Sequence, residues 1–240
     1  GLRWLEEAVA RERTGRTLCS LGDGYILLGR LKEAETCLLE ATSHDDAPAT
    51  TWTDLGQVLL RRGRADEAIE ALERAAELRP HDPKVLSNLG GGLGTVGRID
   101  EAERWFVRAL ELEPASDSAH AGRVAVLYRQ GAWGELIDEL ERRVAAVPDD
   151  GTAWLRLADL RIDDELDVRR RDPIGAVHAA LRARTLLGAE PSVEFVLART
   201  LRARGDLEEA RDTAAGALES LPEDDPWRAR IEALLSELLP

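Results

Sequence analysis

The chain has 240 residues, of which 32 are basic and 46 are acidic, so its formal net charge is −14. So acidic a chain is a poor general binder of nucleic acid and of anionic membranes, and we expect neither as a partner. No apolar run approaches the roughly 18 residues that a membrane-spanning helix needs, so we expect no membrane insertion.

Glycines and prolines recur along the chain with a fixed spacing. Four glycines and three prolines keep a period of 34 residues: Gly29, Gly63, Gly97, Gly131, Pro80, Pro114 and Pro148. Both series then jump by 74 residues, to Gly205 and Pro222, which is two periods plus six residues. A fixed period of this length is the signature of a stacked structural repeat. One unit therefore carries a six-residue insertion.

The period divides the chain into consecutive units. We expect residues 1–14 to hold the helix of a partial leading repeat, and residues 225–240 to form an amphipathic helix that caps the last unit. The full units between them are 15–48, 49–82, 83–116, 117–150, 151–190 and 191–224. The whole chain, 1–240, is expected to form a single solenoid. It begins at Gly1 and contains no Met, which we interpret as a piece of a longer protein.

Each unit is expected to be a helix–turn–helix hairpin. Large apolar residues at the fourth, seventh and eleventh positions share one helical stripe, as Trp52, Leu55 and Leu59 do. Small residues recur at the eighth, twentieth and twenty-seventh positions, where they let two helices approach closely. Glycine at the fifteenth position gives the first helix a left-handed end, and a later proline stops the second helix. One hairpin cannot bury its own apolar face, so neighbouring hairpins must stack.

Unit 49–82 carries the most complete pattern, in the order Trp52, Leu55, Gly56, Ala68, Ala75 and Pro80. In spacing and residue type the chain resembles the tetratricopeptide repeat family over about residues 15–224. The resemblance implies an all-α fold, a right-handed α-α superhelix of stacked hairpins. It also implies a non-catalytic protein–protein interaction module that binds a peptide or partner segment in its concave groove.

Some positions depart from that pattern. Unit 117–150 has polar residues at three places that are usually apolar or small, which predicts irregular packing: His120, Arg123 and Arg143. In unit 191–224, Glu194 stands where a large apolar residue is usual, and we expect Phe195 to take its place. Asp46 replaces the proline of unit 15–48.

The six extra residues lie in unit 151–190. A mostly acidic stretch at 163–167 is followed by arginines at 169–171 and then by Pro173, which is expected to start the second helix. The segment 162–173 favours a lengthened, solvent-exposed helix and turn. A protrusion specific to a partner is the alternative.

The resemblance implies that the first helix of each hairpin lines the groove. Seven residues at its inward positions are basic and four are acidic, which leaves +3 in a chain of net charge −14. The basic residues are Arg16, Arg61, Lys84, Arg129, Arg156, Arg199 and Arg202, and the acidic ones are Asp23, Asp54, Asp159 and Asp163. This sign favours an acidic or carboxylate-bearing peptide with arginine as the bidentate anchor. The alternative is that these arginines lie on a solvent-exposed helix face and bind no ligand.

We expect contacts with the peptide at eleven groove positions: Asp54, Gln57, Arg61, Lys84, Asn88, Gly91, Tyr128, Arg129, Arg156, Arg199 and Arg202. Gly91 would let a ligand backbone come close, although close helix packing would also explain this glycine. The clamp with which chaperone-binding members hold a C-terminal carboxylate is not expected. Only Asn88 fits its pattern, and four other positions do not: Thr53, Gln57, Ser118 and Gly122.

We expect no cofactor, no metal and no catalytic group. Cys19 and Cys37 lack a metal-ligand spacing and are interpreted as buried or half-buried thiols. Two other functions stay open: a substrate-recruiting or regulatory domain of a larger multidomain enzyme, and a self-associating scaffold. A monomer or a weak homodimer through the ends is expected. Composition and family habit favour a bacterial, cytoplasmic protein, with a periplasmic one as the alternative.

Overall fold

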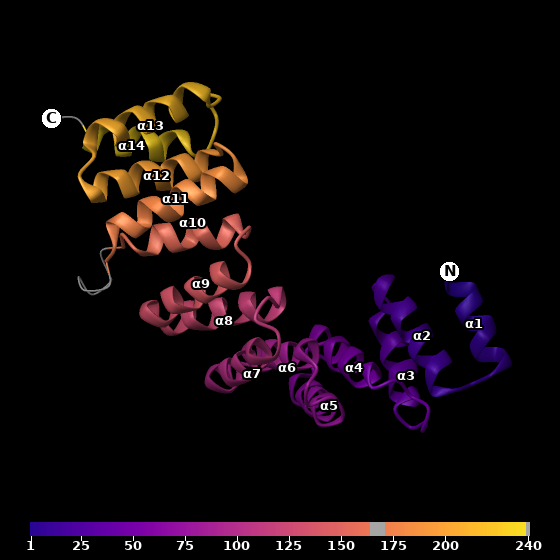
Figure 1. Cartoon of the computed structure of the whole chain (residues 1–240). Coiled ribbons are helices and arrows are strands. Elements are labelled where there is room, and N and C mark those ends of the chain that lie inside the picture. The colour runs from indigo at the N-terminus through magenta and orange to yellow at the C-terminus, as the bar shows by residue number, and fades with distance from the viewer. Residues whose placement is uncertain (164–170, 239–240) are drawn as a thin grey trace. The chain divides into compact units, whose positions relative to one another are not determined.

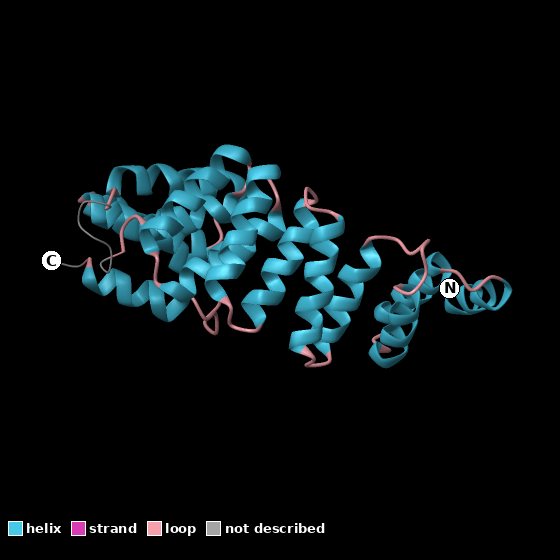
Figure 2. Cartoon of the chain, turned by 90° about the horizontal axis from the view of Figure 1, so that it is seen from below, coloured by secondary structure: helices cyan, strands magenta, loops and turns pink. Residues whose placement is uncertain are grey.

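The computed structural model describes residues 1–163 and 171–238. Within these residues every regular element is an α-helix and none is a strand, which confirms an all-α helical repeat fold (Figure 2). Contacts divide the chain into two compact units, unit 1 (Gly1–Val126) and unit 2 (Leu127–Pro240), which are described separately below. In the described part of the chain, no helix is both long and apolar enough to cross a membrane.

The helices follow one another with short connections, as labelled in Figure 1. The first seven are α1 (Leu2–Arg11), α2 (Gly15–Leu27), α3 (Leu31–Ala41), α4 (Thr50–Arg61), α5 (Ala65–Leu78), α6 (Pro83–Thr95) and α7 (Ile99–Leu112). The rest are α8 (Asp117–Gln130), α9 (Trp133–Ala146), α10 (Gly151–Leu160), α11 (Pro173–Leu187), α12 (Pro191–Arg204), α13 (Leu207–Ser220) and α14 (Arg228–Glu237).

Glycine and proline end the helices where the period predicts. Five glycines that follow the first helices of hairpins have φ between 67° and 102°: Gly29, Gly63, Gly97, Gly131 and Gly205. Residues with a side chain rarely adopt this left-handed backbone, so glycine sets the turn. Four prolines stand two residues after the last residue of a second helix, namely Pro80, Pro114, Pro148 and Pro222. Both roles expected from the sequence are confirmed.

Small residues allow the two helices of a hairpin in unit 1 to touch. Helix α2 packs on α3, α4 on α5 and α6 on α7. A Cβ atom at Gly22 would lie 2.8 Å from Leu38 Cγ, and one at Gly56 would lie 2.6 Å from Leu72 Cγ. Both distances are shorter than van der Waals contact, so a larger residue would push the helices apart. The buried leucines of the second helices fill the space that the glycines leave.

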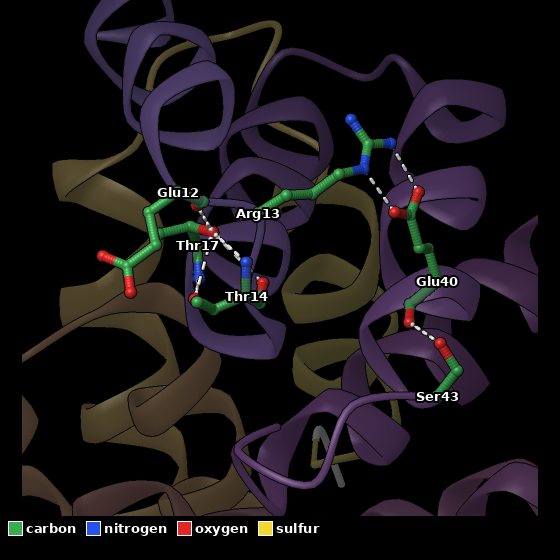
Figure 3. Close-up of polar contacts among 6 residues, drawn as sticks. All are labelled: Glu12, Arg13, Thr14, Thr17, Glu40 and Ser43. Atoms are coloured by element: carbon green, nitrogen blue, oxygen red, sulfur yellow. Dashed lines mark hydrogen bonds and ion pairs between the residues drawn. The ribbon is translucent and has the colours of Figure 1, made fainter.

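The link between α1 and the first full hairpin is held by polar contacts (Figure 3). Arg13 forms two hydrogen bonds with the carboxylate of Glu40 on α3, one of them 2.6 Å long. Thr14 and Thr17 cap the start of α2 reciprocally, and the Thr17 hydroxyl also donates to the Glu12 carbonyl at 2.8 Å. The reciprocal cap satisfies the Thr17 amide, which the first turn of the helix would otherwise leave without a partner.

The residue that replaces proline in the first repeat also serves this helix start. The Asp46 carboxylate accepts a hydrogen bond from the Gly15 amide at 2.8 Å. That bond holds the pKa of Asp46 below its usual value. An anion at the N-terminus of a helix is stabilised by the exposed amides there. Asp46 therefore ties the end of the hairpin 15–48 back to its beginning.

In unit 2, α10 pairs with α11 and α12 with α13, and α14 packs on both α12 and α13 (Figure 1). The core of α12 differs from the expectation. Glu194 itself is buried, at 5% exposure, and its Oε1 lies 2.8 Å from Arg184 Nε of α11. Phe195 does not replace it: the ring is half-buried and faces Trp227 with the centroids 5.6 Å apart. Adjacent residues of a helix point about 100° apart, so Phe195 cannot occupy the direction that Glu194 takes.

The repeat with the insertion begins with a short helix. Helix α10 ends at Leu160, so the lengthening expected for this helix is not found in the residues described. Pro173 stands in the first turn of α11, as predicted, and the Asp172 carboxylate caps this helix by accepting from the Gly175 amide at 2.9 Å. The central part of the insertion, 164–170, lies outside the described residues.

Candidate functional site

A cavity of about 380 Å³ lies between α12 and α14 in unit 2. Its lining combines three arginines, one carboxylate and an apolar surface: Phe195, Arg199, Arg202, Arg230, Ala233, Leu234 and Glu237. We call it the arginine pocket. Its volume is in the range of ligand sites in proteins, and its mixture of apolar floor and charged rim is typical of them.

The arginines of the pocket are oriented by neighbouring groups. Arg199 Nη1 donates to Asp159 of α10, and Arg202 Nη1 donates to Glu237 of α14. The guanidinium carbon of Arg230 lies 4.9 Å from the centroid of the Trp227 ring. These contacts already order the long side chains. A ligand that binds them would therefore cost less side-chain conformational entropy.

Burial acts on the acid that faces Arg199. It raises the pKa of Asp159 above its usual value; Asp163 also raises it, and Arg199 opposes the shift. The attraction to the guanidinium therefore does not fully offset the loss of hydration. The carboxylate of Asp159 is consequently less firmly ionised than an exposed aspartate.

The floor of the pocket is aromatic and aliphatic. Phe195 and the buried Leu234 line the pocket, and the Phe195 ring meets that of Trp227, which is not part of the lining, at 50°. Arg199 also lies over the Phe195 ring, 5.7 Å from its centroid. The site can thus bury an apolar side chain while it offers several N–H donors to an anion.

The other groove positions expected in unit 2 lie outside this pocket. Tyr128 is 64% exposed, and its ring meets that of Trp133 edge-on at 5.2 Å. Arg129 of α8 and Arg156 of α10 are exposed and do not line the cavity. The structure therefore brings together Arg199 and Arg202 of the predicted set.

In unit 1 the expected positions lie on α4 and α6, which are in contact. Gln57, Arg61 and Lys84 are exposed, and Asn88 is half-buried. Asp54 is the group most affected by its surroundings. Burial, together with the nearby Asp23, raises the pKa of Asp54 to about 6, although Lys84 acts in the opposite direction.

The glycines of α6 separate into two kinds. A Cβ at Gly92 would lie 2.7 Å from Leu72 Cδ1, and one at Gly90 would lie 3.0 Å from the Phe106 ring. These two glycines serve close helix packing. A Cβ at Gly91 would meet nothing within 4 Å, so packing does not explain that glycine.

Three residues of the arginine pocket region were missed from the sequence: Trp227, Arg230 and Glu237. Arg230 and Glu237 belong to α14 and Trp227 directly precedes it, and this segment was expected only to cap the last repeat. The signal was present, since Trp227 and Arg230 stand three residues apart and therefore on one side of a helix. What the sequence did not show is that this side of α14 meets Phe195 and Arg202 of α12.

The packed hairpins define an all-α protein of the helical-repeat class. Tetratricopeptide repeat profiles match residues 15–46, 46–115 and 191–215, and the chain belongs to the tetratricopeptide repeat family. No curated protein matches the chain.

Solved structures with the same fold are numerous, and three illustrate the range. MamA of Desulfovibrio magneticus RS-1 is 26% identical with a TM-score of 0.55, and the match covers 71% of this chain and 93% of MamA. The pilF protein of Pseudomonas aeruginosa is 20% identical with a TM-score of 0.65, covering 93% and 99%. YrrB, described as a TPR protein with an unusual peptide-binding site, is 15% identical with a TM-score of 0.58, covering 80% and 97%.

Proposed function

We propose that the chain is a non-catalytic protein-interaction module and that its arginine pocket holds a carboxylate-bearing segment of a partner protein. The observation that carries the proposal is the convergence of Arg199, Arg202 and Arg230 over an apolar floor. The family supports the general role, because tetratricopeptide repeats typically serve protein interaction. The description of YrrB as having a peptide-binding site favours a peptide as the ligand of the fold.

The chemistry of the pocket suits a carboxylate with an adjacent apolar side chain. A guanidinium carries five N–H donors, and the bonds of Arg199 and Arg202 to their acids each engage Nη1. The remaining donors can bind a second carboxylate in the bidentate manner typical of arginine. Phe195 and Leu234 supply the surface against which an apolar side chain would be buried.

Two carboxylates limit the affinity of the site. Glu237 lines the pocket and Asp159 binds Arg199, so both repel a second anion. The net charge of the lining residues is +2, from three arginines and one glutamate. We therefore expect recognition that weakens as ionic strength rises, with the apolar contact supplying the part that salt does not screen.

The remaining aspects of the function follow the same reasoning. The proposed binding role is also compatible with a chain that acts as the recruiting domain of a larger protein. We propose a cytoplasmic location, which the free thiols Cys19 and Cys37 support, since thiols stay reduced there. The exposed groove residues of unit 1, among them Arg61 and Lys84, are proposed to contact a peptide separately from the arginine pocket.

The test is the binding of short fluorescein-labelled peptides by fluorescence anisotropy. One peptide alternates glutamate with phenylalanine, and its counterpart has lysine in place of each glutamate. The variant Arg199→Gln/Arg202→Gln should weaken binding of the acidic peptide at least about tenfold. The control Arg3→Gln/Arg74→Gln makes the same change of charge at two exposed ion pairs and should bind normally. Equal loss in both variants would show general attraction by charge, and no binding by the parent chain would reject the proposal.

A further inference from the structure

Three potential metal ligands meet on the first helices of two successive hairpins in unit 1. Cys19 and Asp23 stand four residues apart on α2, and therefore on the same side of that helix. Asp54 stands on α4, which is in contact with α2. One ligand atom from each, the Cys19 sulfur and one carboxylate oxygen from each aspartate, lie within 4.8 Å of one another.

The surroundings of this cluster differ from those of ordinary surface acids. Cys19 is only 4% exposed, so the sulfur approaches the two carboxylates from the protein interior. Asp54 is half-buried, so its carboxylate is partly withdrawn from water. Asp23 lies at the exposed end of the cluster, where solvent can enter.

A buried hydroxyl beside the cluster supplies the second observation. Thr51 of α4 is completely buried, and its Oγ1 has no hydrogen-bond partner of acceptable geometry. Buried polar groups are rarely left in this condition, so the orphaned hydroxyl needs an explanation. Burial is the main reason that the pKa of the Cys19 thiol is raised, and Asp23 and Asp54 raise it further, whereas the neighbouring Thr51 hydroxyl acts in the opposite direction. A bound cation would offset these effects and favour the thiolate, which is the form in which cysteine binds metals and an acceptor for this hydroxyl.

We propose that Cys19, Asp23 and Asp54 bind a divalent transition-metal ion, with Zn²⁺ as the best match. A thiolate with two carboxylates is a ligand set of sulfur and oxygen, which disfavours Mg²⁺ and Ca²⁺ because these ions bind oxygen alone. Three protein ligands leave one position of a tetrahedral site for water at the exposed side. On binding, the Cys19 proton passes to solvent and the sulfur donates its electron pair to the ion.

The geometry requires only a modest contraction. Tetrahedral Zn²⁺ with bonds of about 2.3 Å to sulfur and about 2.0 Å to oxygen places these ligand atoms about 3.5 Å apart. The exposed carboxylate of Asp23 can rotate toward the buried sulfur without disturbing the core. The bound ion would link α2 to α4 and so fasten the hairpin 15–48 to the hairpin 49–82.

The site goes beyond peptide binding by the arginine pocket, from which it is independent in position and in chemistry. It departs from the expectation of no metal, which rested on the spacing of cysteine and histidine in the sequence. The sequence spacing could not reveal the site, because Asp54 comes from the next repeat.

Cobalt is the probe of choice, because a thiolate bound to Co²⁺ gives a charge-transfer absorption band that carboxylates do not give. The full chain, reduced and freed of metal with a chelator, is titrated with Co²⁺ and then with Zn²⁺. We expect the band to appear with one equivalent of Co²⁺, to be removed by Zn²⁺, and to resist excess Mg²⁺. Bound Zn²⁺ should also raise the thermal unfolding midpoint by several degrees, since the ion binds the folded state.

Matched variants decide which residues bind. Cys19→Ser should abolish the band, and Asp54→Asn should weaken Co²⁺ binding at least about tenfold. Thr51→Val, which removes only the outer hydroxyl, should weaken it by about 10-fold or more. Cys37→Ser is the control, because the other thiol has neither aspartate beside it and should leave the band unchanged. A parent chain without the band, or a band lost in the Cys37 variant and kept in the Cys19 variant, would overturn the proposal. Circular dichroism of each variant distinguishes lost binding from lost folding.

Discussion

Arg143 Nε donates a hydrogen bond to Asp150 Oδ2 at 2.7 Å, across the connection between α9 and α10. The arginine is only 7% exposed, at a position where other repeats bury alanine. The other oxygen of Asp150 accepts from the Ala153 amide at 2.9 Å and caps α10. One carboxylate thus both neutralises a buried cation and starts the next helix.

Replacing that carboxylate should be costly. In Asp150→Ala we expect the free energy of unfolding to fall by about 3 kcal/mol or more. A buried ion pair is broken, and a helix cap worth about 1 kcal/mol is lost. Asp149→Ala is the matched control, since Asp149 is exposed and precedes the cap. Urea denaturation of both variants measures the difference. A loss of less than about 1 kcal/mol in Asp150→Ala would show that the pair contributes little.

The pair also shows where sequence reasoning ends. The position of Arg143 predicted a disturbance of the regular packing, but the period could not say which group would meet its charge. The partner, Asp150, is the last residue of the repeat 117–150. It reaches Arg143 only because the chain turns between α9 and α10. The period identifies equivalent positions, whereas contacts between them depend on the path of the backbone.

Two glycines, Gly91 on α6 and Gly122 on α8, should respond oppositely to the same substitution. In Gly91→Ala the added Cβ meets no atom within 4 Å, so alanine should stabilise α6 by up to about 1 kcal/mol. In Gly122→Ala the Cβ would lie 2.2 Å from the buried Phe106 ring, and overpacking should destabilise by about 1–3 kcal/mol. Thermal unfolding of each variant gives the sign directly.

The contrast tests the assignment of the two glycines. If both variants were destabilised, Gly91 would have a structural role that the open space around it does not suggest. If neither were destabilised, the ring of Phe106 would have moved aside. The fluorescence of Trp105, in the same helix, would report that movement.

The buried Glu194 provides a third prediction. Its Oε1 is 2.8 Å from Arg184 Nε, yet the angle is too poor for a hydrogen bond, and burial raises the pKa of this carboxyl. The Arg184 side chain is 47% exposed, so water can solvate it once the acid is gone, and Glu194→Leu removes a buried charge without leaving another one buried and unpaired. We expect Glu194→Leu to be at least as stable as the parent chain by urea denaturation. Glu190→Leu, at an exposed position just before α12, is the control and should change little.

The sequence predicted the architecture more completely than it predicted the candidate sites. The glycine and proline period marked the helix ends, because those residues act through local backbone geometry. The arginine pocket depends on where α14 places Arg230 and Glu237 against α12, and nothing local encodes that. The metal-ligand cluster likewise requires Cys19 and Asp54 to meet across two repeats. The sequence thus predicted properties that depend on a single residue. It did not predict which distant residues lie close together.

The raised pKa of Asp54 predicts a dependence of stability on pH. The pKa is about 6 in the folded chain, against 3.8 for an ordinary aspartate, so the folded state holds the proton more tightly. Stability therefore falls as pH rises from about 4 to about 6 and is level above that range. Asp54→Asn removes this loss. Because Asp54 is only half-buried, we discount the effect for solvent screening to about 1 kcal/mol.

Urea denaturation at pH 4 and pH 7, with a chelator present, measures this difference. The advantage of Asp54→Asn over the parent chain should be larger at pH 7 than at pH 4 by about 1 kcal/mol. Asp66→Asn is the matched control, because it makes the same change at an exposed aspartate in the first turn of α5. The charges that act on Asp54 are Asp23 from α2 and Lys84 from α6. An advantage that is the same at both pH values would mean that Asp54 titrates as an ordinary aspartate and that its neighbours leave it well hydrated.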